Sequence, residues 1–207
     1  MNVETALITF VIAASLLTIT PGLDTAIVLR TAAVEGPRRA ALAALGVVCG
    51  CLVWGAAVAL GMGALLAASS LAYTLLKWAG AAYLAWLGIK LLLKPRSAFE
   101  LAVPAGAASS GNWWLRGFLT NLLNPKVGVF YVSFLPQFVP VNVAPAPFMF
   151  ALAAIHSALG VIWFAALIAA TTPLKRWLQR QAVVRWLDRI TGAVFIGFSL
   201  RLALDRR

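Results

Sequence analysis

Charged residues are scarce in this sequence, and acidic residues are scarcest. Only 11% of the 207 residues are charged, with six Asp or Glu and one His, whereas a soluble domain carries about a quarter. The 62% hydrophobic content and the mean hydropathy of +0.93 exclude an ordinary soluble domain. Several apolar runs exceed the ~20 residues that a helix needs to cross a bilayer. Because backbone groups must pair within lipid, the sequence predicts an all-α integral membrane protein.

The sequence also lacks the patterns that accompany catalysis. It has no metal-ligand cluster, no Ser/His/Asp set and no phosphate-binding glycine-rich loop, so we expect a protein that is not an enzyme and holds no cofactor or metal. Cys49 and Cys51 lie two positions apart in an apolar run. Helical side chains at that spacing diverge, which favours packing residues over a disulfide. The N-terminus lacks the basic region of a cleavable signal peptide.

Six membrane spans are predicted, and two of them are interrupted. The longest polar connection predicts a cytoplasmic linker over residues 94–113, between three-helix units at 1–93 and 114–207. The expected spans are 5–34, broken at Pro21; 39–68; 71–93; 114–139, broken at Asn124–Pro125; 147–171; and 190–204, with an amphipathic start near Val183.

The net charge of +11 comes from basic residues in short connections between apolar runs. This placement favours membrane orientation over nucleic-acid binding. The positive-inside rule puts the connections after spans one, three and five in the cytoplasm and both termini outside. Arg206 and Arg207 argue against an outside C-terminus, and a five-span arrangement with a cytoplasmic tail stays open. The basic residues near the three connections are Arg30, Arg38, Arg39, Lys90, Lys94, Arg96, Arg116, Lys175, Arg176, Arg180, Arg185 and Arg189.

The two halves resemble each other. Pro21 and Pro125 are 104 positions apart, the WGAAVA and WFAALIA segments 109, and the KWAGAAYL and RITGAVFI segments 112. Each half holds three spans, so the second half enters the membrane from the opposite side. This pattern predicts two inverted three-helix repeats, an architecture that many secondary transporters use.

Paired breaks at corresponding positions of two halves indicate a transport site. Thr20 and Asn124 fit as N-caps, each followed by a proline in the first helical position. A half-helix N-terminus attracts a carboxylate. Buried Asp24 and Lys126 need an aqueous cavity or a partner.

The charges near the two breaks allow two interpretations. In the first, Asp24 would bind an ammonium or exchange a proton while Lys126 binds a carboxylate, which suits a zwitterion. In the second, the two residues would form a structural ion pair without substrate contact. Asn121 would add amide hydrogen bonds. His156, the single histidine, is interpreted as a packing residue or as a proton relay with Asp24.

Four segments resemble the LysE/RhtB family of amino-acid exporters, and together they extend over most of the chain. They are TPGLDTAIVLRTAAVEGPRRAALAALGVVCG (20–50), KWAGAAYLAWLGIKLLL (77–93), GFLTNLLNPKVGVFYVSFLPQFV (117–139) and, more loosely, DRITGAVFIGFSLRLAL (188–204). The homoserine/threonine/leucine branch is the most similar, although Leu23 and Cys51 depart from its pattern. The resemblance places Pro21, Gly22, Asp24, Asn121, Asn124, Pro125 and Lys126 on motif positions.

The resemblance implies a proton-driven, multi-pass exporter of amino acids or related metabolites in the cell inner membrane. Its partners would be the amino-acid substrate and the lipid bilayer, with a homodimer as an open assembly and no nucleic acid. Two alternatives stay open. One is an inorganic-ion or metal exporter with the same six-span arrangement, which would require several intramembrane carboxylates or histidines. The other is a membrane thiol–disulfide electron carrier that uses Cys49 and Cys51.

Overall fold

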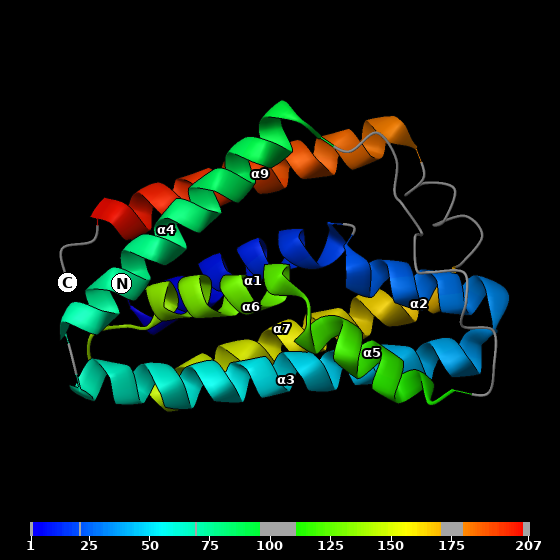
Figure 1. The fold of residues 1–207 in the computed structure, drawn as a ribbon, viewed down its shortest axis with the longest axis horizontal. Helices are drawn as coiled ribbons and strands as arrows, with labels where there is room; N and C mark the ends of the chain where they lie inside the picture. The colour runs from blue at the N-terminus through cyan, green and yellow to red at the C-terminus, as the bar shows by residue number, and fades with distance from the viewer. Residues whose placement is uncertain (1, 21, 69, 96–110, 171–179, 205–207) are drawn as a thin grey trace.

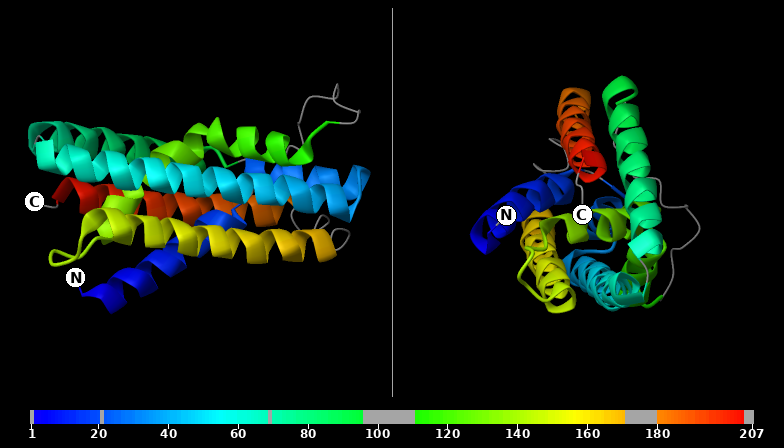
Figure 2. Two further views of the ribbon diagram at one scale, coloured as in Figure 1. Left: turned by 90° about the horizontal axis from the view of Figure 1, so that it is seen from below. Right: turned by 90° about the vertical axis from the view of Figure 1, so that its left-hand side faces the viewer.

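A computed structural model describes residues 2–20, 22–68, 70–95, 111–170 and 180–204. Within these ranges every regular element is helical, which agrees with the all-α prediction. In an elongated bundle, α3 and α7 run side by side along the long axis, whereas α4 crosses that axis obliquely (Figures 1 and 2). The predicted linker falls mostly on residues 96–110, which lie outside the described ranges, so the division into two three-helix units stays a prediction.

The first predicted span consists of α1 (Val3–Ile19) and α2 (Leu23–Val34), whose axes differ by 51°. Pro21 itself lies outside the described residues. The prediction that Thr20 caps α2 is wrong, because Gly22 is the N-cap residue and makes no side-chain capping bond. The Thr20 hydroxyl instead turns back to the Leu16 carbonyl and pairs with Thr191, so Thr20 ends α1.

The second interruption has the predicted geometry. The fourth span divides into α5 (Trp113–Leu122) and α6 (Pro125–Phe134), followed by the short 3₁₀ helix η1 (Leu135–Phe138). Asn124 is the N-cap of α6, and its side-chain oxygen accepts a hydrogen bond from the Lys126 backbone N–H at 3.1 Å. Pro125 follows at the first helical position, where its missing N–H costs nothing.

The remaining predicted spans correspond to α3 (Pro37–Ala68), α4 (Ser70–Leu93), α7 (Pro145–Ala169) and α9 (Gln181–Leu204). Among the described residues, two stretches are long and apolar enough to cross a membrane alone, Pro37–Gly61 and Pro145–Ala169, and α1 with α2 adds a third as one bent span. The structure therefore fits a helical membrane protein, while the count of six spans and their inverted repeat stay predictions.

Close helix contacts depend on glycine. A Cβ on Gly117 of α5 would lie 1.9 Å from the Ala43 carbonyl oxygen of α3, and a Cβ on Gly46 would lie 2.0 Å from the Trp114 carbonyl oxygen. Gly88 and Gly192 bring α4 and α9 together in the same way, and these two helices form a pair along one side of the bundle (Figure 1). Such small-residue crossings are typical of membrane helices.

Two buried clusters lie on either side of the helix breaks. The aromatic cluster combines α1, α3, α6, η1, α7 and α9, and its aromatic side chains on α1, α6 and η1 are Phe10, Phe130, Tyr131, Phe134 and Phe138. In it, the Phe10 and Phe138 rings meet edge to face at 5.3 Å. The aliphatic cluster combines α2, α3, α7 and α9 and contains Ile27, Leu29, Val47, Leu167 and Leu187. The breaks thus separate two packed regions along the bundle.

Candidate functional site

A cavity of about 70 Å³ lies at the two breaks, between the aromatic and the aliphatic cluster. It has room for several water molecules. Four of its lining residues are the polar or charged groups predicted from the sequence: Asp24, Asn124, Lys126 and His156. Gly22 also lines it. Residues next to both breaks therefore line one cavity, while the symmetry that would relate the two breaks stays a prediction.

Asp24 is held by a residue on another helix. The Asn121 amide, fully buried on α5, donates to Asp24 Oδ2 at 2.8 Å. Asn124 lies close to the same carboxylate. The second oxygen, Oδ1, is buried but has no hydrogen bond of normal geometry within the described ranges. A carboxylate oxygen in that state has an unused capacity to accept hydrogen bonds from a bound molecule.

Lys126 supplies positive charge near both Asp24 and His156. Its ammonium lies beside Gly22, since a Cβ at position 22 would be 3.7 Å from Lys126 Nζ. Asp24 comes from the first half of the chain and Lys126 from the second. The cavity thus holds charge of both signs.

His156 on α7 is buried and lines the cavity. Its Nδ1 shares a hydrogen bond of 2.9 Å with the hydroxyl of Tyr131, a fully buried residue of α6. Tyr131 in turn lies near Cys51. His156 is thus a buried, hydrogen-bonded residue, and the bond leaves the ring's other nitrogen for a second contact.

Sequence reasoning missed several buried polar residues near this site. Cys51 was interpreted as a packing residue or, in one alternative, as a redox thiol, but its sulfur is 3.3 Å from the Asn121 amide nitrogen, which donates to it, and it lines the cavity. Tyr131 and Ser157 are also buried and were not singled out. The only signal in the sequence was a polar side chain within an apolar run. That signal does not show whether the side chain faces the cavity, because the buried face of a helix depends on the helices packed against it.

A second hollow of about 380 Å³ lies on the other side of the α5–α6 break. Its lining is mostly apolar, with Trp54, Tyr83 and Val129 among its residues. Asn124 lines both hollows. The capped start of α6 therefore separates the charged cavity from an apolar one.

The described residues contain no group of three His, Cys, Asp or Glu side chains that would hold a metal ion. Within those ranges Cys49 and Cys51 are free thiols rather than a disulfide. Neither observation supports the alternatives of a metal exporter or a thiol–disulfide electron carrier.

A bundle of apolar helices with a charged cavity at two helix breaks is typical of membrane transporters. The family model of the LysE type translocators matches residues 15–206, and this chain belongs to that family. The resemblance noted from the sequence is therefore confirmed. No solved structure matches the chain.

Three relatives illustrate the match. The uncharacterized membrane protein YrhP of Bacillus subtilis is 30% identical over 97% of this chain and 99% of its own. The threonine efflux protein of Escherichia coli K12 is 33% identical over 90% of this chain and 91% of its own. The leucine efflux protein of Klebsiella pneumoniae is 30% identical over 95% of this chain and 93% of its own.

Proposed function

We propose that this protein exports amino acids or related small metabolites across the cytoplasmic membrane. Its relatives include proteins named for the efflux of threonine and of leucine. Both compounds are zwitterions, and they share an ammonium and a carboxylate while differing in the side chain. The cavity offers a complementary pair of charges, with Asp24 from α2 and Lys126 from α6.

The unpaired Oδ1 of Asp24 is the observation that carries this proposal. A carboxylate engaged only in a structural ion pair would be expected to use both oxygens, because a buried acceptor without a donor is costly. A substrate ammonium, with its three donors, would satisfy Oδ1. Lys126 and the N–H groups at the start of α6 would then bind the substrate carboxylate, next to the Asn124 cap.

Transport would proceed by alternating access of the two inverted units, residues 1–93 and 114–207, around the breaks at Pro21–Gly22 and Asn124–Pro125. The aromatic and aliphatic clusters lie on opposite sides of the cavity and would act as the two barriers that open in turn. Asp24 and His156 are the candidates for proton exchange, because both line the cavity and can change protonation state. The homodimer stays a prediction.

Asp24→Asn and Lys126→Ala test the site. Each is expected to reduce amino-acid export at least about tenfold, because each removes one charge-assisted contact with the substrate. Export is measured as labelled amino acid released from preloaded cells, and profiling of the medium identifies the compound. Glu4→Gln and Lys94→Ala are matched controls, since both residues are exposed and far from the cavity linings.

Membrane abundance of each variant is measured alongside export, so that loss of protein is not mistaken for loss of transport. Full export by both cavity variants would refute the substrate site and favour a structural ion pair. If the overexpressing cells released an inorganic ion and no amino acid, the ion-exporter alternative would replace this proposal.

A further inference from the structure

The hydroxyl of Ser157 is the one polar group of α7 at the cavity whose hydrogen bonding the structure leaves open, within the described residues. Ser157 is 5% exposed and follows His156 directly. Its oxygen lies near the Tyr131 hydroxyl but makes no hydrogen bond of normal geometry. A serine in an apolar helix normally bonds to the carbonyl four residues earlier, as Ser133 does to Val129 in α6. Ser157 departs from that pattern.

The space beside Ser157 is open. Gly160 lies one helical turn further along α7 and lines the same cavity. A Cβ built on Gly160 would meet only Phe164 Cε2, at 3.8 Å. The rest of this part of the cavity is apolar, with Val48 and Phe164 among the lining residues. A small side chain would fit between these surfaces with one hydrogen-bonding group in reach.

Several other polar groups of the cavity already have roles. Asn124 caps α6, His156 bonds to Tyr131, and Asp24 and Lys126 are assigned to the charged groups of the substrate. Ser157 can both donate and accept, which matches the chemistry of an alcohol. A site that hydrogen-bonds a substrate hydroxyl discriminates strongly against an analogue without one, because its own polar group is then left unpaired.

We propose that Ser157 is a specificity-determining residue that recognises a side-chain hydroxyl, so that the cavity favours small hydroxy amino acids over aliphatic ones of the same size. This inference rests on the proposed export of amino acids. It adds a second contact region, on α7, to the charged region formed by α2 and α6.

The test compares threonine with valine, which have nearly the same shape but carry a hydroxyl and a methyl group, respectively, at one position. Export of both labelled compounds is measured in cells that carry the wild type, Ser157→Ala, Ser157→Thr or Ser199→Ala. Ser199 is a matched control, because it is also 5% exposed but donates to the Ile196 carbonyl oxygen of its own helix, outside both cavity linings.

Ser157→Ala is expected to lower the threonine-to-valine export ratio about fivefold, the effect of one lost hydrogen bond. Ser157→Thr keeps the hydroxyl and is expected to keep the ratio, as is Ser199→Ala. Valine export by Ser157→Ala shows that the variant is folded. If Ser157→Ala is absent from the membrane, the threonine-to-valine export ratio of Ser157→Thr becomes the test. A ratio that falls until valine is preferred overturns the proposal.

An unchanged ratio in Ser157→Ala, an equal loss of both compounds, or a wild type that exports valine but not threonine overturns the role of Ser157 while leaving amino-acid export in place. A wild type that exports neither threonine nor valine nor any other amino acid overturns the proposed function itself. The two failures are therefore distinguishable.

Discussion

A few buried side chains determine how the cavity is organised at the residue scale. Asn121 links three helices, because it extends from α5 to Asp24 on α2 and to Cys51 on α3. Tyr131 links α6 to His156 on α7. Each bond joins elements that are far apart in the sequence. In a low-dielectric interior such bonds are strong when complete and costly when broken.

The Tyr131 hydroxyl offers a test of this linkage. Tyr131→Phe is expected to destabilise the protein by about 1–3 kcal/mol, because His156 loses its partner while remaining buried. Thermal unfolding in detergent measures the effect. Tyr83→Phe is the control, since Tyr83 is only half-buried and lines the apolar hollow. Equal stability of the two variants would show that the Tyr131–His156 bond contributes nothing.

Helix contacts position these side chains at the element scale. Gly46 and Gly50 lie on one face of α3, four residues apart, and α5 crosses that face. A Cβ on Gly50 would lie 2.6 Å from Asn121 Oδ1 and 2.9 Å from Asn121 Cβ. The absence of a side chain at position 50 therefore allows Asn121 to reach Asp24.

Gly50→Ala is expected to displace Asn121, to destabilise the protein by about 1–3 kcal/mol and to reduce export. Gly61→Ala is a closely matched control, because Gly61 belongs to the same helix and a Cβ added there would meet nothing within 4 Å. Unfolding temperature and export are measured for both. If Gly50→Ala behaved like Gly61→Ala, the close crossing of α3 and α5 would not position the amide.

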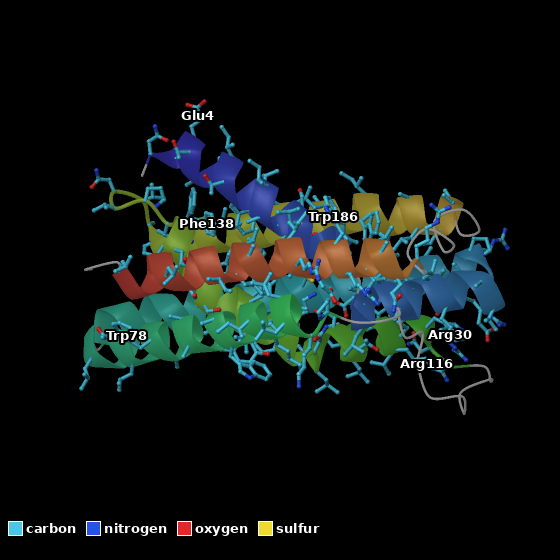
Figure 3. All side chains as sticks on the ribbon, turned by 90° about the horizontal axis from the view of Figure 1, so that it is seen from above. Glu4, Arg30, Trp78, Arg116, Phe138 and Trp186 are labelled. Carbon is cyan, nitrogen blue, oxygen red and sulfur yellow. The ribbon has the colours of Figure 1, made fainter. Side chains whose placement is uncertain are left out.

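Across the whole molecule, the two ends of the bundle carry different charges. Figure 3 places Arg30 and Arg116 at one end of the bundle and Glu4 at the opposite end. The beginning of α1 and the end of α9 lie together at the end that carries Glu4 (Figures 1 and 2). The count of six spans, with both termini on one side of the membrane, stays a prediction.

Reporter fusions test this orientation. Alkaline phosphatase, which is active only outside the cytoplasm, is expected to be active when fused after Val143 or Leu204 and inactive after Pro95. The physical reason is that Lys90, Lys94 and Arg116 flank the central connection and are retained inside. Green fluorescent protein at the same positions gives the reverse pattern. An active phosphatase after Pro95 with an inactive one after Leu204 would invert the topology.

Helix positions were predictable because apolar run length and proline act locally. The predicted spans 39–68 and 71–93 agree closely with α3 and α4, and the Asn124–Pro125 cap was identified from its residue types. Thr20 was assigned wrongly with the same rule. The Thr20 hydroxyl could either cap the start of α2 or bond at the end of α1. The proximity of Thr191 on α9 favours the bond at the end of α1.

The sequence by itself determined that the chain is a helical membrane protein, where its helices break, and that Asp24 and Lys126 need an aqueous cavity or partner, because these follow from hydropathy, proline geometry and the cost of burying charge. Only the tertiary structure decided which polar groups meet. The contacts of Asn121 with Cys51 and of Tyr131 with His156 join separate helices, and such contacts depend on how closely glycine lets those helices approach.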